Sequence, residues 1–263
     1  MSSSKPTVAV YKFSSCDGCQ LSLLNLEDEL LELTGLVEIA YFLEARRRVL
    51  PGPYDIGLVE GSVTTEEEIE RIKKIRRECK YLIALGTCAT AGGVQALRNF
   101  GNVDLLTQTV YQHPEFIATL PTSTRIADHV KTDLELWGCP VNKYQVAEVV
   151  AALLQQRRPN LPEYPVCLEC KLNGNICIMV AKGVPCLGPI TRAGCGAICP
   201  SMHRGCYGCF GPCPTASVEA FAPLLKAMER YPGEGLHLLR TISGNAPEFL
   251  RAAEIIENEE VTS

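Results

Sequence analysis

The sequence has little of several features that mark common functional classes. It has 25 Lys and Arg against 30 Asp and Glu, a formal net charge of −5, so the basic excess typical of nucleic-acid-binding surfaces is missing. No apolar run approaches the ~20 residues needed to cross a bilayer. Residues 1–6 lack the apolar stretch or twin arginine of an export signal. We therefore expect a soluble, cytoplasmic chain with no nucleic-acid partner and no membrane insertion.

Histidine is also scarce. The four histidines stand in no metal-ligand spacing. Cysteine, in contrast, is abundant: the chain has 14, and nine of them lie within residues 167–213. Reducing conditions in the cytosol disfavour disulfides, so cysteines in Cys-x-x-Cys spacing indicate metal ligands or redox thiols.

The first part of the chain alternates strand and helix patterns. The leucine-rich segment 21–33 has helical periodicity that we expect Gly35 to stop, Thr65 can cap a helix with Glu68 three residues on, and residues 144–155 form a further helix. Apolar, β-branched strands are predicted at residues 7–13, 37–43, 55–60, 81–85 and 133–137. Buried strands alternating with helices predict an α/β fold, here a flavodoxin-like parallel sheet covered on both faces.

The pattern changes near residue 159. Residues 157–162 have the composition of a linker, and residues 163–215 show little regular periodicity but many Gly, Pro and Cys. Metal centres can replace a hydrophobic core in such a segment. Helices are predicted at 216–230 and 246–258. The expected domains are therefore 1–158, the sheet domain, and 159–263, an irregular cysteine-rich domain with C-terminal helices.

Four early cysteines follow three of the predicted strands. Cys16 and Cys19 follow the first, Cys88 follows the fourth and Cys139 the fifth. In an open parallel sheet, sites collect outside the carboxyl ends of the strands, so these four thiols are expected to meet at one edge. Cys79 stands at the end of a helix pattern, where a small buried core residue is the favoured interpretation.

The late cysteines divide by spacing into two groups of four and one extra residue. The groups are Cys167, Cys170, Cys177 and Cys186, then Cys195, Cys199, Cys206 and Cys209; Cys213 is the extra residue. Four ligands suit either zinc or a [4Fe–4S] cube, so the count indicates three metal centres and leaves a zinc-stabilised interaction module open. The four early cysteines come from distant loops, unlike the ligands of zinc fingers. Residues 206–214 are similar to part of a ferredoxin run. Both observations favour iron–sulfur.

The motifs resemble those of one known family. Their order in the chain is Cys16-Asp17-Gly18-Cys19, Glu60-Gly61-Ser62, Gly86-Thr87-Cys88, Gly138-Cys139-Pro140, then Cys167-Leu-Glu-Cys170, Cys186-Leu-Gly-Pro189 and Cys206-Tyr-Gly-Cys209. This order is similar to that of the small subunit of [NiFe] hydrogenases, over residues 7 to about 213. The resemblance is greatest to the delta subunit of cytoplasmic sulfhydrogenase, NAD(P)-linked or methyl-viologen-reducing types, with deazaflavin- and heterodisulfide-reductase-linked hydrogenases as close relatives.

The resemblance implies three [4Fe–4S] clusters and an electron-transfer role. The proximal cluster would lie on Cys16, Cys19, Cys88 and Cys139, the distal cluster on Cys167, Cys170, Cys177 and Cys186, and the medial cluster on Cys195, Cys199, Cys206 and Cys209. Cys213 would be the spare thiol, with the alternative that it replaces Cys199. The implied partners are the large subunit, which holds the Ni–Fe site, and iron–sulfur or flavin NAD(P)-reductase subunits.

Two further expectations concern the site and the alternatives. Glu60 follows a strand on the edge of the proximal ligands, where accepting loop amides is favoured over a role in proton handling. A quinone-reductase-like subunit of the complex I type shares the proximal-cluster domain but needs only the first cysteine set, so the nine later cysteines argue against it.

Overall fold

A computed structural model describes residues 5–262. The chain forms two compact units, the first ending at Asn160 and the second beginning at Leu161. The first unit is built on a five-stranded parallel sheet in the order β2-β1-β3-β4-β5. The strands are β1 (Thr7–Lys12), β2 (Glu38–Phe42), β3 (Tyr54–Glu60), β4 (Cys79–Leu85) and β5 (Leu134–Leu136). The five predicted strands and the α/β class are confirmed.

The register of this sheet aligns the carboxyl ends of four strands. Lys12 is paired with Glu60, Glu60 with Leu85, and Leu85 with Leu136. The central strands β3 and β4 are nearly all buried, as expected for strands with helices on both faces. One row of residues therefore marks the edge from which the site loops depart.

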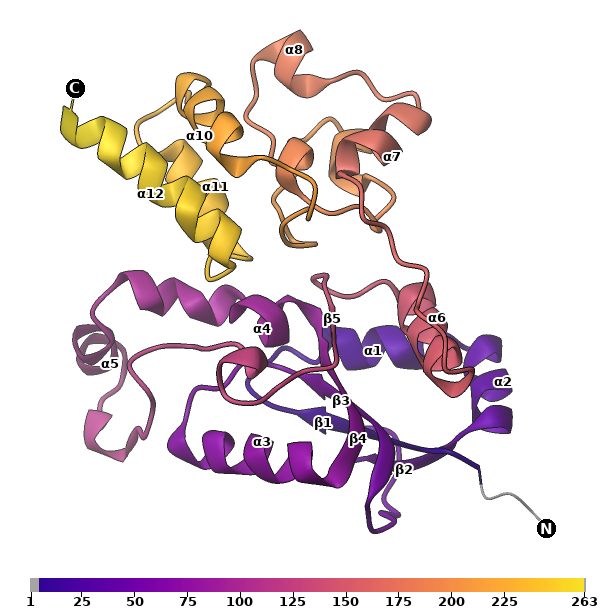
Figure 1. Ribbon diagram of the computed structural model, residues 1–263. Coiled ribbons are helices and arrows are strands. Elements are labelled where there is room, and N and C mark those ends of the chain that lie inside the picture. The colour runs from indigo at the N-terminus through magenta and orange to yellow at the C-terminus, as the bar shows by residue number, and fades with distance from the viewer. Residues whose placement is uncertain (1–4, 263) are drawn as a thin grey trace. The chain divides into compact units, whose positions relative to one another are not determined.

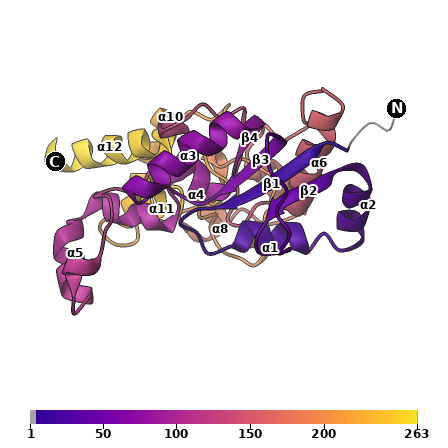
Figure 2. The same ribbon diagram turned by 90° about the horizontal axis from the view of Figure 1, so that it is seen from below.

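Helices cover both faces of this sheet. Figure 1 shows α3 (Glu66–Glu78) on one side of the strands and α1 (Gly18–Leu24) on the other, and the view in Figure 2 agrees. The remaining α-helices of the unit are α2 (Asp28–Leu36), α4 (Gly86–Ala91), α5 (Val103–Val110) and α6 (Lys143–Leu154). Short 3-10 helices lie at Val94–Phe100, Pro114–Phe116 and Ile126–Asp128.

The leucine-rich segment 21–33 is not one helix, so that prediction was wrong. The first helix, α1, ends at Leu24, and Glu27, whose positive φ of 54° is not helical, precedes a second helix that begins at Asp28. Gly35 does not stop α2, which continues to Leu36. The predicted cap on α3 is confirmed: the Thr65 hydroxyl accepts the amide of Glu68 at 3.2 Å, and the Glu68 carboxylate accepts the amide of Thr64 at 2.7 Å.

The second unit contains more helix than the sequence pattern indicated. Residues 163–215 include three short helices, α7 (Val166–Leu172), α8 (Ile178–Lys182) and α9 (Ile198–Ser201), and a 3-10 turn at Gly188–Ile190. After them come α10 (Val218–Ala227), α11 (Glu234–Thr241) and α12 (Pro247–Thr262), of which α11 was not predicted. Gly233, with φ of 81°, provides the left-handed residue from which α11 starts.

The two ends of the second unit have different cores. Phe221 and Leu225 of α10 and Phe249 and Ile256 of α12 are buried, and α10 packs against α12. The core around α7 to α9 is small and is shared with thiols: Val166, Ile178 and Ala197 pack with Cys186 and Cys206. Between residues 5 and 262, no helix is both long and apolar enough to cross a membrane.

Candidate functional site

The loop after β1 presents two cysteines at the aligned strand ends. Asp17 lies between them with φ of 66°, and its carboxylate is 2.5 Å from the ammonium of Lys12, the last residue of β1. This left-handed turn starts α1 immediately, so Cys19 is buried in the first turn of the helix while Cys16 stays exposed. The two thiols of this Cys-x-x-Cys motif therefore have different access to solvent.

The other two cysteines of the first group follow β4 and β5, the last two strands in the sheet order. Cys88 lies in α4, directly after β4, and Cys139 follows β5. The Thr87 amide donates to the Gly138 carbonyl at 2.9 Å, which joins the two loops. Cys88 is half-buried and Cys139 is exposed.

The glycines of these loops show how closely the three segments approach. A Cβ on Gly86 would collide with Cys19 Sγ, and one on Gly18 would lie 3.6 Å from the side chain of Pro140. The loop after β1 therefore touches both the start of α4 and the segment after β5. Only glycine leaves room for the Cys19 thiol at position 86, where φ is also 83°.

The four thiols of the first group interact electrostatically. Burial raises the pKa of Cys19, and the charges of Cys88 and Cys139 raise it further. Burial raises the pKa of Cys88 to about 11, with contributions from Cys139 and Cys16, and the pKa of Cys139 is raised by burial and by Cys16. Such thiols stay protonated at neutral pH unless a bound cationic centre compensates the thiolate charge. The structure thus brings together the four early cysteines expected at this edge.

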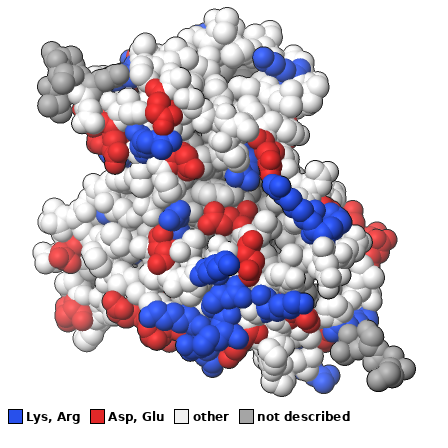
Figure 3. Space-filling model, viewed as in Figure 1, with Lys and Arg blue, Asp and Glu red and all other residues white. Residues whose placement is uncertain are grey.

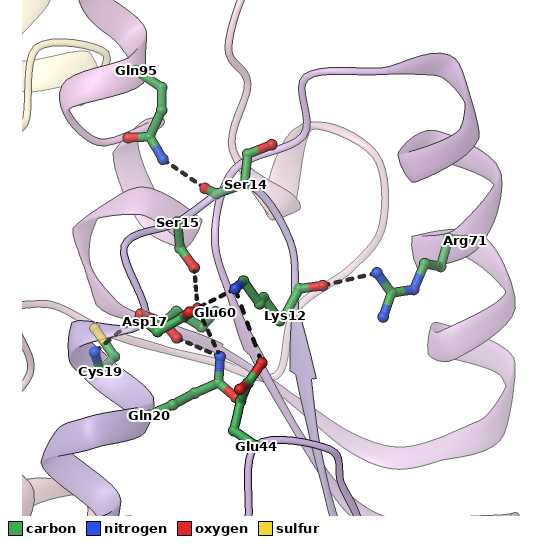
Figure 4. A network of polar contacts seen from close by, with 10 residues as sticks. All are labelled: Lys12, Ser14, Ser15, Asp17, Cys19, Gln20, Glu44, Glu60, Arg71 and Gln95. Carbon is green, nitrogen blue, oxygen red and sulfur yellow. Dashed lines mark hydrogen bonds and ion pairs between the residues drawn. The ribbon is translucent and has the colours of Figure 1, made fainter.

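Glu60, at the end of β3, is only 1% exposed. Its carboxylate accepts the Cys19 amide at 3.0 Å and the Gln20 side-chain amide at 2.8 Å, and Figure 4 shows these groups converging. Burial raises its pKa, while the two hydrogen bonds oppose that shift. The prediction that Glu60 accepts a loop amide is confirmed.

Two glutamines beside this group were missed by the sequence reasoning. Gln20 is buried and donates to Glu60, and Gln95 donates to the Ser14 carbonyl at 2.6 Å and accepts a weak hydrogen bond from the Cys88 thiol at 3.6 Å. Gln20 carries one usable signal, because it is a polar residue next to a candidate ligand on a helix that packs on a sheet. Gln95 carries none, since it lies in a 3-10 helix, Val94–Phe100, whose sequence shows no amphipathic periodicity.

The second cysteine group lies in the second unit, around α7 and α8. Cys167 and Cys170 lie in α7, Cys177 is the residue before α8, and Cys186 follows α8. Gly188 brings two of them together, since a Cβ there would lie 3.3 Å from Cys186 Sγ and 3.4 Å from Cys167 Sγ. Burial raises the pKa of Cys167 to about 11, and Cys186, Cys170 and Cys177 raise it further. The structure therefore places the four thiols of this group near one another.

The third group forms two interacting pairs. The charge of Cys199 raises the pKa of Cys195, whose main cause of elevation is burial, and Cys209 acts in the same way on deeply buried Cys206. Backbone amides oppose the shifts: those of Ala197 and Ile198 point to Cys195, and that of Gly208 lies 3.5 Å from Cys206 Sγ. Amide donors of this kind favour the thiolate form.

One backbone amide connects the second and third groups. The Cys206 N–H donates to Cys186 Sγ at 3.1 Å. Glu169, in α7, adds a second link, because its carboxylate accepts the Gly194 amide at 2.9 Å and its charge raises the pKa of Cys195. The two late groups are therefore neighbours within one small core.

The two cysteines outside the groups have other surroundings. The Cys213 thiol is buried, donates to the Glu163 carbonyl at 3.5 Å and lies 3.3 Å from the Thr215 hydroxyl. Cys79 begins β4 in the core of the sheet unit, and a Cβ on Gly57 would touch its Sγ. The interpretation of Cys79 as a core residue is confirmed.

The arrangement fits a group larger than one ion. Among the side chains that the structure describes, in residues 5–258, no three from Cys, His, Asp or Glu are placed to hold a single metal ion. A [4Fe–4S] cube does not require that spacing, because each thiolate binds a different iron atom. All-thiol donor sets, glycines that clear space beside Cys19 and Cys186, and amide N–H groups aimed at sulfur all suit such a cube.

The chain matches one family model and several known relatives. A family model described as NADH ubiquinone oxidoreductase, 20 Kd subunit, matches residues 16–153. Sulfhydrogenase 2 subunit delta of Pyrococcus furiosus is 39% identical over 219 residues, which cover 83% of this chain and 92% of that protein. This chain belongs to the family of [NiFe] hydrogenase small subunits.

Two further similarities extend the comparison within the hydrogenase family. The F420-non-reducing hydrogenase of Methanocaldococcus jannaschii has a subunit that is 35% identical over 234 residues, covering 78% of this chain and 81% of that protein. A chain in a crystal structure of an NAD+-reducing [NiFe]-hydrogenase in the H2-reduced state is 28% identical, with a TM-score of 0.55, covering 60% of this chain and 96% of that one. The chain is thus an electron-transfer subunit of a [NiFe] hydrogenase complex.

Proposed function

We propose that this chain relays electrons between the Ni–Fe site of a hydrogenase large subunit and a flavin- or NAD(P)-linked partner through three [4Fe–4S] clusters. The observation that carries the proposal is the convergence of thiols from three separate loops on the aligned strand ends of the first unit. A structural zinc knuckle would draw its cysteines from one or two adjacent turns. The proposal includes a cytoplasmic location, where reducing conditions keep thiols available as ligands.

The proposed ligands follow the three cysteine groups. They are Cys16, Cys19, Cys88 and Cys139 for the proximal cluster; Cys167, Cys170, Cys177 and Cys186 for the distal cluster; and Cys195, Cys199, Cys206 and Cys209 for the medial cluster. The hydrogen bonds of Cys213 to Glu163 and Thr215 support its assignment as the spare thiol.

The chain's own residues would set the properties of these sites. When bound, each cluster would accept and release one electron at a time. Amide donors at Cys186 and Cys206 stabilise negative charge on sulfur, which raises the reduction potential of a site relative to one without them. Glu60 fixes the Cys19 amide and so holds the loop that carries two proximal ligands.

The proposed electron acceptor rests on the relatives. One solved relative is described as NAD+-reducing, and another relative is a subunit of an F420-non-reducing hydrogenase. The second candidate function, a quinone-reductase-like subunit, is favoured only by the description of the family model. That model ends at residue 153, whereas the similarity to the sulfhydrogenase subunit covers 83% of the chain.

Anaerobic purification and reconstitution test the proposal. We expect about twelve iron atoms and twelve sulfides per chain, with reducible spectroscopic signals. Cys199→Ala should lower the iron content by up to about four atoms, while the matched change Cys213→Ala should leave it unchanged. A colourless protein that contains zinc and no acid-labile sulfide would refute the iron–sulfur assignment, and iron loss in Cys213→Ala but not in Cys199→Ala would exchange their roles. A nickel-containing partner that co-purifies would identify the large subunit.

A further inference from the structure

Helix α7 contacts the second and third cysteine groups with different residues. Cys167 and Cys170 are three positions apart on one side of the helix and belong to the second group. Glu169 and Asn173 are four positions apart on another side, and both bond to the loop that carries Cys195 of the third group. One short helix therefore connects the two late groups.

Two hydrogen bonds hold this loop on either side of Cys195. The Glu169 carboxylate accepts the Gly194 amide at 2.9 Å, and the Asn173 side-chain amide donates to the Gly196 carbonyl at 2.8 Å. Gly194 and Gly196 have φ of 129° and 68°, values that favour glycine, so the loop turns at both attachment points. Because Cys195 lies between these points, the carboxylate of Glu169 is fixed beside it.

No cation balances the Glu169 carboxylate. Among the residues that the structure describes, its second oxygen, Oε2, is buried without a hydrogen-bond partner, and no Lys, Arg or His side chain forms an ion pair with it. Burial is the main cause that raises the pKa of Cys195, and the charge of Glu169 raises it further. A buried charge of this kind is screened by salt much less than an exposed one.

The other charges in this part of the chain are basic. Residues 166–204 contain four Lys and Arg but only one acidic residue, Glu169. Lys171 and Lys182 are exposed, and Figure 3 shows the surface around α8 as mainly white, with blue and no red beside it. Burial raises the pKa of Cys167 in the second group, and the charge of Lys171 opposes that shift. Charges of opposite sign therefore act on the two late groups.

We propose that Glu169 lowers the reduction potential of the medial site and so favours transfer of an electron from the medial site to the distal site. A reduced site carries one more negative charge than the oxidised site, so a fixed carboxylate beside it stabilises the oxidised form. Electrons from hydrogen oxidation leave the medial site more readily than they would without this charge. The inference rests on the proposed function, because it takes the second and third cysteine groups as the distal and medial cluster sites.

The test is a redox titration of the anaerobically purified complex, reduced stepwise with dithionite and followed by electron paramagnetic resonance. The signal that Cys199→Ala alters belongs to the medial site, and the signal that Cys177→Ala alters belongs to the distal site. Glu169→Gln removes the charge but keeps an oxygen for the Gly194 amide, so the iron content should be unchanged. We expect the medial equilibrium to shift at least ten-fold toward the reduced form, about 59 mV for one electron, and the distal equilibrium to shift less than two-fold.

Two control variants separate the place of the charge from its amount. Glu254→Gln removes the same charge at an exposed position of α12 in the same unit, and both equilibria should stay within two-fold of the wild type. Lys171→Gln should shift the distal equilibrium toward the oxidised form, by less than the medial shift in Glu169→Gln, because Lys171 is exposed. Raising the salt concentration should reduce the Lys171→Gln effect and leave the Glu169→Gln effect unchanged.

Three results would overturn the inference. One is an unchanged medial potential in Glu169→Gln at full iron content, and another is an equal shift of that potential in Glu254→Gln. The third is loss of the medial iron in Glu169→Gln, which would show that Glu169 only holds the loop of Cys195. Failure of the proposed function is distinct, because it appears as missing iron in the wild-type chain.

Discussion

Gly86 offers a quantitative test of how closely the site loops are packed. A Cβ added there would strike the Cys19 thiol, and the residue has φ of 83°. A left-handed conformation costs a non-glycine residue about 1–2 kcal/mol, and overpacking a buried contact costs about 1–3 kcal/mol. Gly86→Ala should therefore destabilise the first unit by about 2–5 kcal/mol, a Tm lowered by roughly 4–20 °C for a unit of this size.

Two other glycines separate the contributions. Gly233 has φ of 81° but open space around its Cβ position, so Gly233→Ala should cost only the conformational part, about 1–2 kcal/mol. Gly35 is helical, and nothing lies within 4 Å of its Cβ position, so Gly35→Ala should stabilise α2 by about 0.5–1 kcal/mol.

The assay is anaerobic thermal unfolding of the reconstituted chain, together with its iron content. Displacement of the Cys19 thiol in Gly86→Ala should also lower the iron content by up to about four atoms, the content of one cube. A Gly86→Ala chain with wild-type iron and a Tm no lower than that of Gly233→Ala would refute the close packing of the loop after β1 against α4.

Three further outcomes are expected. Cys139→Ser should remove up to about four iron atoms from the reconstituted chain. Cys79→Ser should keep all its iron, but its free energy of unfolding in urea should fall by about 1–3 kcal/mol, because the serine hydroxyl is buried in the sheet core. Equal iron loss in both variants would contradict the grouping. Glu60→Gln leaves one carbonyl for two amide donors, so the free energy of unfolding should fall by about 1–3 kcal/mol, with no loss of hydrogen turnover per intact complex. A variant that keeps its iron and its stability but loses turnover would instead show a proton-handling role for Glu60. Removing iron with a chelator should abolish the hydrogen-exchange protection of residues 166–209, because the core around α7 to α9 is small, and should leave β3 and β4 protected. An equal loss of protection in both regions would contradict this.

The fold of the first unit was largely predictable because its signals are local. Buried strands such as 55–60 and 81–85 are apolar runs bounded by glycine, and each gave a strand in the structure. The break at Glu27 was not predictable, since a non-glycine residue with positive φ leaves the leucine periodicity intact. Placing the early cysteines needed only the rule that parallel strands end at one edge.

The second unit was less predictable for a physical reason. Its short helices α7, α8 and α9 have four to seven residues, too few to show an amphipathic repeat, and their contacts are made with thiols as much as with apolar side chains. The division of the late cysteines into two groups by spacing stays a prediction. The bond from the Cys206 amide to Cys186 could not be predicted, because it joins residues 20 positions apart through an irregular loop.

That bond also bears on how the family's electron relays can be recombined. Since the peptide N–H of Cys206, in the third cysteine group, donates to the sulfur of Cys186, in the second, neither late group is structurally independent of the other. A chimera that exchanges only one of them between relatives would leave the remaining site with a foreign neighbour at its sulfur. The transferable piece is the whole stretch from Cys167 to Cys209, inherited together.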